Sequence, residues 1–230
     1  MAFQATSNDL WTVGPGGAVA WQMGMMSGTS PSITALSRGG YEGAFQANTS
    51  DLWTFGTAGD NDWQMGMMSG TSPSITALSG GGYEGAFQAN TSDLWTFGTA
   101  GVTDWQLGMM SGTSPSITAL ASGGFEVAFQ ANTSDLWTVG TAGDTDWQMG
   151  MMSGTSPSIA PLTAGGYEAA FQADTTGLWT AGTPGTTEWQ MPMASSTSPS
   201  ITTLVGGGGE VALQATSTNL WTFGTGDAAD

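Results

Sequence analysis

The chain has 230 residues, with 18 aspartate and glutamate residues against a single basic side chain, and it contains neither histidine nor cysteine. The net charge of -17 excludes a surface that neutralises nucleic-acid phosphates, and it disfavours binding to an anionic membrane. No apolar run reaches the length of a bilayer span, and no basic segment followed by an apolar stretch opens the chain, so neither membrane insertion nor a signal peptide is expected.

The sequence repeats with one constant period. Phe45 and Phe87 lie 42 residues apart, and no copy carries an insertion or a deletion. The same step separates the members of two tryptophan series: Trp11, Trp53, Trp95, Trp137, Trp179 and Trp221, and Trp21, Trp63, Trp105, Trp147 and Trp189. A period of this size is typical of a solenoid, a propeller or an array of small domains.

Within one repeat the sequence predicts four short strands. They are expected at Pro73–Leu78, Tyr83–Ala89, Leu94–Gly98 and Trp105–Met109, separated by glycine-rich or Asn-Thr-Ser-Asp turns. No segment has the 3.6-residue period of a helix. Because four strands in 42 residues match the size of a propeller blade, the predicted fold is an all-β propeller with four-stranded blades.

The number of blades depends on how the chain ends are used. The sequence contains 22 predicted strands and begins and ends within a repeat. If Pro-Ser-Ile-Thr is the innermost strand, the last repeat lacks only its outer strand, and Trp21–Met25 can supply it. This exchange predicts five blades in a single domain, 1–230, and leaves Ala2–Gly14 as a surplus hairpin. The alternative is six blades, two of them incomplete.

Catalysis and metal binding are not predicted. Without histidine and cysteine the chain lacks the usual zinc ligands and nucleophile–base pairs. Asp60 and Asp62 offer oxygen ligands that suit calcium, but the first repeat and the repeats that contain Asp104 and Glu188 do not keep this pattern, which favours solvated loop charge. The remaining carboxylates occur once per repeat, whereas an acid/base site needs two in unequal environments. We therefore expect a protein that is not an enzyme and has no metal or cofactor.

Polar residues recur on one face of the second predicted strand. These are Glu42, Glu84, Glu126, Glu168 and Glu210, followed on the same face by Gln46, Gln88, Gln130, Gln172 and Gln214. Buried polar groups need hydrogen-bond partners, so one interpretation is a structural set of bonds between blades. The other is a repeated notch, formed with the aromatic series Trp21, Trp63, Trp105, Trp147 and Trp189, in which sugar hydroxyls meet polar groups and sugar C–H faces meet a ring.

The order of motifs resembles the blades of bacterial and fungal β-propeller lectins. It runs Ser-Pro-apolar, glycine turn, Tyr-Glu-x-Ala-Phe-Gln, short polar turn, Leu-Trp-Thr and a second Trp, and this order extends over the repeats with some substitutions. The pattern is similar to the fucose-binding propellers and the Photorhabdus-type lectins, and the five-bladed tachylectin-2 type is similar in size.

The resemblance also assigns positions to a sugar site. In the fucose-binding family an arginine on the second strand, a glutamate on the third strand and an aromatic side chain hold the sugar. By position, the arginine falls on the Glu42 series, and the aromatic residue is matched by the Trp63 series. The family's glutamate falls on Thr54, Thr96, Thr138, Thr180 and Thr222. Both polar ligands are replaced, so the resemblance implies a glycan site and leaves the sugar open.

The predicted function is multivalent carbohydrate binding by a monomeric lectin, since many weak sites on one body give avidity. The partners would be glycans, with no nucleic acid. The lectin resemblance implies a secreted or cell-surface protein. The alternative is a structural or protein-interaction repeat module that is not an enzyme, either a natural accessory domain or an engineered propeller.

Overall fold

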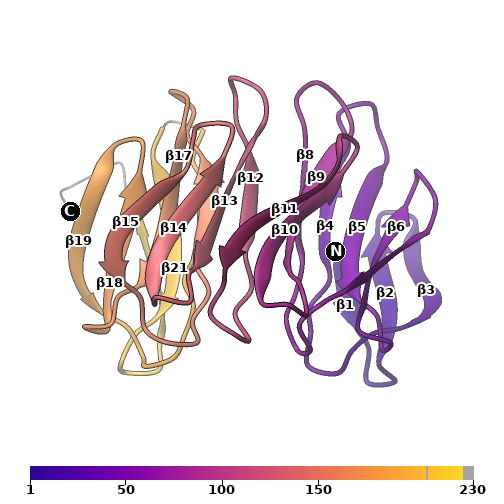
Figure 1. Ribbon diagram of the computed structural model, residues 1–230, viewed down its shortest axis with the longest axis horizontal. Helices are drawn as coiled ribbons and strands as arrows, with labels where there is room; N and C mark the ends of the chain where they lie inside the picture. Colours follow the sequence, from indigo (N-terminus) through magenta and orange to yellow (C-terminus); the bar gives the residue numbers. More distant parts are fainter. Residues whose placement is uncertain (206, 225–230) are drawn as a thin grey trace. The chain divides into compact units, whose positions relative to one another are not determined.

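The computed structural model describes residues 1–205 and 207–224, and these residues form only strands, turns and loops (Figure 1). No helix in this described part is long and apolar enough to cross a membrane. The chain divides into two compact units, Met1–Ser114 and Pro115–Asp230. Short β-branched and aromatic runs bounded by glycine and polar turns favour strands, which explains why the whole sequence adopts this one kind of element.

The first unit holds eleven strands: β1 (Ala2–Gln4), β2 (Asp9–Gly14), β3 (Gly17–Gly24), β4 (Ser32–Ala35), β5 (Tyr41–Gln46), β6 (Asp51–Gly56), β7 (Asn61–Gly66), β8 (Ser74–Ala77), β9 (Tyr83–Gln88), β10 (Asp93–Gly98) and β11 (Gly101–Gly108). The second unit holds the other eleven: β12 (Ser116–Ala119), β13 (Phe125–Gln130), β14 (Asp135–Gly140), β15 (Thr145–Gly150), β16 (Ser158–Pro161), β17 (Tyr167–Gln172), β18 (Gly177–Gly182), β19 (Gly185–Pro192), β20 (Ser200–Thr203), β21 (Gly209–Gln214) and β22 (Leu220–Gly224).

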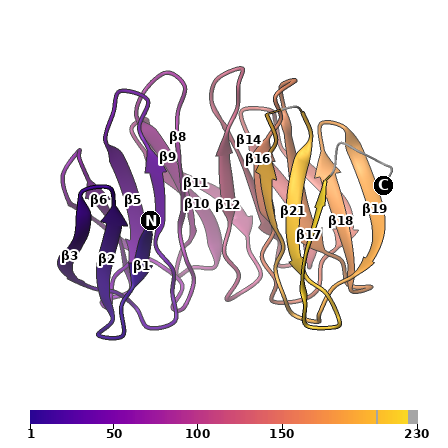
Figure 2. The ribbon, with the colours of Figure 1, turned by 180° about the vertical axis from the view of Figure 1, so that it is seen from behind.

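The described strands form six antiparallel sheets (Figures 1 and 2). Four sheets have four strands, β4 to β7, β8 to β11, β12 to β15 and β16 to β19, each in sequence order. The first sheet, β1–β2–β3, and the last, β20–β21–β22, have three strands each. The predicted all-β fold with four strands per complete repeat is confirmed.

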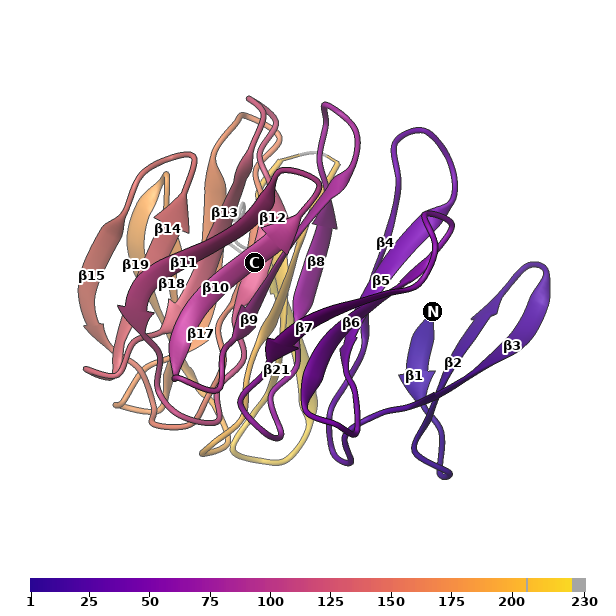
Figure 3. The ribbon, with the colours of Figure 1, turned by 45° about the vertical axis from the view of Figure 1, so that its right-hand side comes forward.

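The first Trp-Gln strand belongs to the first sheet, which corrects the predicted blade count. Strand β3 pairs with β2, and Gly14 lies opposite Gly17, so Pro15 and Gly16 form a two-residue hairpin turn (Figure 3). The predicted exchange, in which Trp21–Met25 completes the last sheet, is therefore wrong, as are the five-blade count and the free Ala2–Gly14 hairpin that followed from it. A tight local turn costs far less chain entropy than pairing two distant strands. The alternative of six blades, two of them incomplete, is confirmed.

The complete sheets share one register with a bulge in the outer pair. In the sheet β8 to β11, Ser74 lies opposite Ala86, and Ala86 lies opposite Thr96. The register of β10 against β11 shifts between Asp93 and Trp95. On β11, close to this shift, Gln106 adopts a left-handed backbone conformation with φ 54. Bulges increase the local twist of a strand and redirect its side chains.

Within each unit, the face of one sheet is buried against the next sheet. Trp63 and Met65 on β7 pack against Phe87 and Phe97 of the following sheet, and the Trp63 and Phe97 ring centroids are 5.4 Å apart. Phe87 and Phe97 are fully buried. Burial of one such side chain stabilises the fold by about 1.5–3 kcal/mol, so contact between neighbouring sheets is the main source of stability.

In each four-stranded sheet, a buried glutamine on the second strand hydrogen-bonds to the loop that follows the sheet. The amide nitrogen of Gln46 donates to the carbonyl of Met68 at 2.9 Å, and its oxygen accepts from the N–H of Gly70 at 3.0 Å. Gln88 makes the same two bonds to Met110 and Gly112, at 3.0 and 3.1 Å. Because both ends of the amide are used inside the protein, this side chain fixes the loop before each innermost strand.

We predict that Phe87→Ala lowers the free energy of unfolding by about 3–5 kcal/mol, because it leaves a cavity between two sheets. The matched control is Phe3→Ala, which changes the same repeat position in the first sheet, where the ring is 38% exposed. That control should cost less than half as much. Urea unfolding followed by tryptophan fluorescence measures both values, and equal losses would contradict the burial argument.

Candidate functional site

An indole and a threonine hydroxyl meet in five of the six sheets. The tryptophan of the fourth strand donates its ring N–H to the threonine of the third strand. The pairs are Trp21–Thr12 (3.0 Å), Trp63–Thr54 (3.2 Å), Trp105–Thr96 (3.2 Å), Trp147–Thr138 (3.0 Å) and Trp189–Thr180 (3.0 Å). All five indoles are half-buried. The bond fixes the orientation of each ring on the outer strand of its sheet.

The predicted glutamate joins this pair from the second strand. Glu42 hydrogen-bonds to Thr54, and Glu84 hydrogen-bonds to Thr96. The carboxyl group packs over a glycine: a Cβ atom at Gly56 would lie 2.8 Å from the Glu42 Oε2 atom. A side chain at Gly56 would therefore displace the carboxyl group.

Burial changes the protonation of these carboxyl groups. Glu42, Glu84 and Glu126 are at most 4% exposed. Removal from water raises the pKa of each of the three to about 7, and hydrogen bonds to the carboxyl groups only partly oppose this. Near neutral pH, these groups exchange between an acceptor-only carboxylate and a carboxylic acid that can donate.

A tyrosine from the following sheet completes the cluster in each unit. In the second unit the hydroxyl of Tyr167 on β17 lies 2.9 Å from the Thr138 hydroxyl on β14, and Tyr167 also bonds to Glu126. In the first unit Tyr83 on β9 hydrogen-bonds to Thr54 on β6. The four side chains Glu, Thr, Trp and Tyr therefore form one polar and aromatic notch between neighbouring sheets.

One notch lacks an aromatic side chain at this position. The residues equivalent to Tyr83 and Tyr167 are Tyr41, Phe125 and, on β21, Gly209. A cavity of about 220 Å³ lies there, lined by Glu168, Trp189, Leu162, Pro184, Thr187 and Gly208. It is smaller than the ~300–1,000 Å³ of sites for drug-sized ligands, which suits a single small ring. The cavity offers the carboxyl group of Glu168, the indole of Trp189 and two threonine side chains, Thr163 and Thr187.

The other predicted site residues lie elsewhere or in a different setting. The amides of Gln46, Gln88 and Gln130 bond to loop backbone, and Gln172 donates to the Ala194 carbonyl at 2.9 Å. Gln214 is exposed. Glu210 lies on the last sheet, which has no fourth strand and so no tryptophan beside it, and Trp21 lies in the first sheet, which has no glutamate at that position. A glutamate and a tryptophan of these two series thus occur together in four sheets, and the glutamines remain apart from them.

A second kind of cavity lies beyond the polar notch. It has a volume of about 220 Å³ and is lined by Trp53, Asn48, Gln22 and neighbouring residues of the first unit. The ring nitrogens of Trp95, Trp137 and Trp179, which repeat the position of Trp53, are buried with no hydrogen-bond partner in the described structure. No cluster of three carboxylates that could hold a metal ion occurs among the described residues.

The fold is similar to several solved lectin structures. The fucose-specific lectin from Aleuria aurantia has a TM-score of 0.60 and 10% identity, over 97% of this chain and 85% of that chain. AofleA from Arthrobotrys oligospora has a TM-score of 0.64 and 13% identity, over 96% and 77%. SapL1 lectin, in complex with alpha methyl fucoside, has a TM-score of 0.62 and 12% identity, over 97% and 87%. No protein-family model and no curated protein matches the sequence.

These similarities establish the fold class. One Aleuria aurantia lectin structure is described as a six-bladed β-propeller, and six sheets of the same kind occur here. The chain is a β-propeller in which each described sheet is a blade. At 10–13% identity, these similarities establish the fold alone.

Sequence reasoning missed two residues that shape the notch. The threonine of Leu-Trp-Thr was noted only for its position, yet it contacts the tryptophan in five blades. The exchange of Tyr for Gly209 is visible in the sequence as Gly-Gly-Gly-Glu in place of Gly-Gly-Tyr-Glu. The sequence does not show that the tyrosine at this position faces the preceding sheet, and so it does not show that glycine leaves a cavity there.

We predict that the melting temperature falls between pH 5 and pH 8. A carboxyl group whose pKa is raised from 4.5 to about 7 on folding adds stability below pH 4.5, and this stability is lost as the pH rises through 7. The chain has no histidine, so few other groups titrate in this range. One pKa unit corresponds to about 1.4 kcal/mol, and 1 kcal/mol to about 2–4 °C, so the fall should be several degrees.

The combined variant Glu42→Gln, Glu84→Gln and Glu126→Gln should lose most of this pH dependence. The matched control replaces the exposed Asp62, Asp104 and Asp146 by Asn, and it should keep the slope. Scanning calorimetry at a series of pH values measures both. An unchanged slope in the glutamine variant would show that these carboxyl groups are not the source.

Proposed function

We propose that this protein is a carbohydrate-binding lectin, and not an enzyme, whose sites are the notches between neighbouring blades. The observation that carries the proposal is the open cavity at Glu168 and Trp189. A pyranose ring needs hydrogen-bond acceptors for its hydroxyl groups and a flat apolar surface for its C–H face, and the carboxyl group and the indole supply these. The lectins with the same fold support a sugar ligand, and two of them were solved with fucosides bound.

The indole of Trp189 is held in place before any ligand arrives. Its ring N–H donates to Thr180 at 3.0 Å, and its ring lies 4.6 Å from Phe223, centroid to centroid. A ring fixed in this way loses little freedom on binding, which favours affinity. Glu168 is 7% exposed, so a hydroxyl that reaches its carboxylate forms a charge-assisted hydrogen bond away from bulk water.

Multivalence is the second part of the proposal. The same Glu, Thr and Trp occur around Glu42, Glu84 and Glu126. In two of these notches Tyr83 or Tyr167 lies beside the threonine. Those sites bind a sugar only when the tyrosine side chain rotates away, so they are weaker than the open site. Several weak sites beside one stronger site would still give avidity on a surface dense in glycans.

We predict that Gly209→Tyr abolishes binding at the open site, because it fills the notch with the side chain that Tyr41, Tyr83 and Tyr167 supply in other repeats. Glu168→Gln should weaken binding about fivefold, since a charge-assisted bond becomes a neutral one at a cost of about 1 kcal/mol. Glu126→Gln, in a filled notch, is the matched control and should leave the affinity of the open site unchanged. The measurement is calorimetric titration with the strongest ligand from a glycan array.

Two outcomes would contradict this assignment. If no glycan on the array binds, the alternative of a structural or protein-interaction module is favoured. If a glycan binds but Gly209→Tyr and Glu168→Gln leave its affinity unchanged, the protein binds glycans at another place.

The reverse substitution tests multivalence. Tyr167→Gly should open the notch at Glu126 and Trp147 and add one binding site of comparable affinity. Titration of this variant should show a stoichiometry one higher than that of the unmodified protein at the same ligand concentrations. Tyr41→Gly is the control, because its notch in the first sheet has no glutamate, and it should add no site.

A further inference from the structure

The notch at Glu168 differs from the notch at Glu126 in a backbone donor. In the hairpin after β14, the N–H of Ala142 donates to the Oε2 atom of Glu126 at 3.1 Å. The residue that corresponds to Ala142 in the next repeat is Pro184, which lines the open cavity beside Glu168. Proline has no backbone N–H, so this hydrogen bond cannot form at Glu168.

A second donor is absent from the same notch. The hydroxyl of Tyr167 bonds to Glu126, and the corresponding residue beside Glu168 is Gly209, which has no side-chain donor. Glu168 keeps other interactions within the chain. Two donors that its equivalent uses are nevertheless replaced by the cavity. A carboxylate that is only 7% exposed is stabilised by hydrogen-bond donors, so a ligand rich in donors fits this place.

No basic side chain of the protein competes for this carboxylate. Glu168 is the one ionisable side chain among the described residues that line the cavity. The second unit contains no lysine, arginine or histidine, because the single basic residue of the chain, Arg38, belongs to the first unit. A sugar with a carboxylate or a sulfate group would therefore meet a like charge and find no cation to bind.

A protonated amine supplies what the notch lacks. An ammonium group has three donors and no acceptor, so one such group can replace both missing donors, whereas each hydroxyl group has one donor. Its bond to a carboxylate is charge-assisted. The face of the adjacent Trp189 indole attracts a cation as well. The net charge of -17 would speed the approach of a cationic ligand.

We propose that the open notch at Glu168 and Trp189 prefers glycans that carry a free, protonated amino group to neutral and acidic glycans. This inference rests on the proposed lectin function and names the ligand class of its open site. The ligand class is the unacetylated amino sugars, whose amine lies beside a pyranose ring that can pack on the indole.

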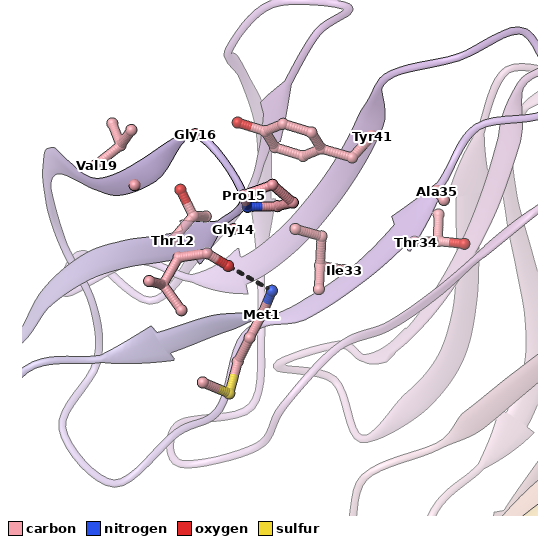
Figure 4. Close-up of a pocket in the computed structure, with 12 residues that line it drawn as sticks. Met1, Thr12, Gly14, Pro15, Gly16, Val19, Ile33, Thr34, Ala35 and Tyr41 are labelled. Atoms are coloured by element: carbon pink, nitrogen blue, oxygen red, sulfur yellow. Dashed lines mark hydrogen bonds between the residues drawn. The ribbon is translucent and has the colours of Figure 1, made fainter.

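A cavity of the first unit shows that volume alone does not give this preference (Figure 4). It measures about 470 Å³ and is lined by Thr12, Val19, Ile33 and Tyr41, among others. None of the residues that line it has a carboxyl side chain. This larger cavity therefore offers no ionic partner for an amine, and the preference is expected at Glu168.

The experiment titrates the whole protein with methyl glycosides that differ only at C2. The methyl β-glycosides of glucosamine and galactosamine are compared with their counterparts that carry a hydroxyl or an acetamido group, at about pH 6, where the amine is protonated. In at least one series, the amine should bind at least about tenfold more tightly than both counterparts. An increase in NaCl from about 0.05 to 0.5 M should remove most of this difference.

Variants locate the preference. Glu168→Gln should abolish it, whereas Asp144→Asn, which removes the same charge from an exposed loop of the second unit, should preserve it. Pro184→Ala restores the backbone N–H and should reduce the preference by about fivefold, because Glu168 regains a donor from the protein. Tyr167→Gly combined with Ala142→Pro copies both differences into the notch at Glu126 and should add a second site with the same preference.

The outcomes separate this proposal from the proposed function. If neither amine binds more tightly than its hydroxyl counterpart, the proposal is overturned, while a neutral glycan from the array that binds at Trp189 leaves the lectin function standing. A preference that survives both Glu168→Gln and Pro184→Ala also overturns the proposal, because it would arise from the overall negative charge. If neither the amines nor any array glycan binds, the proposal and the lectin function both fail.

Discussion

No sheet of this chain can bury both of its faces alone, and the rest of the structure depends on the contact between neighbouring blades. Trp63 and Met65 of one blade cover Phe87 and Phe97 of the next, and a buried glutamine such as Gln46 fixes the loop between them. Because the repeats are nearly identical, the Trp and Met side chains of each blade cover the aromatic side chains of the next blade in the same way. In the first unit no sheet precedes β1–β3, and Phe3 on β1 is 38% exposed.

The same contact creates the candidate site. The tryptophan that covers the next blade also donates to a threonine of its own blade, and the threonine adjoins a buried glutamate. One residue of the next blade decides whether the notch is filled. Tyr167 fills the space above Thr138, and Gly209 leaves it empty above Glu168. A single change within a repeat can therefore convert a structural contact into a cavity without altering the backbone of the blade.

The period and strand positions follow from the sequence, because turns and alternation are local. The strand predicted at Tyr83–Ala89 is β9, Tyr83–Gln88. The number of blades did not follow from the sequence, because the strand that contains Trp21 could pair either with β2 or with the last sheet. The Pro15-Gly16 turn is the local signal that decides for β2. Alternation placed Gln46 with Glu42, yet its amide bonds to Met68, a contact across a loop that no local pattern reveals. The cavity beside Gly209 could not be predicted, because the sequence does not show that this position faces Glu168 and Trp189.

The claim that a notch between blades is a sugar site is tested most directly by a crystal structure with the strongest glycan from the array. One sugar ring should lie against the indole of Trp189, with a hydroxyl bonded to the carboxylate of Glu168. The notches that contain Tyr83 and Tyr167 should be empty, or should show the tyrosine rotated out wherever a sugar is present. A well-ordered glycan bound away from Trp189, or a sugar beside an unmoved Tyr167, would contradict the account.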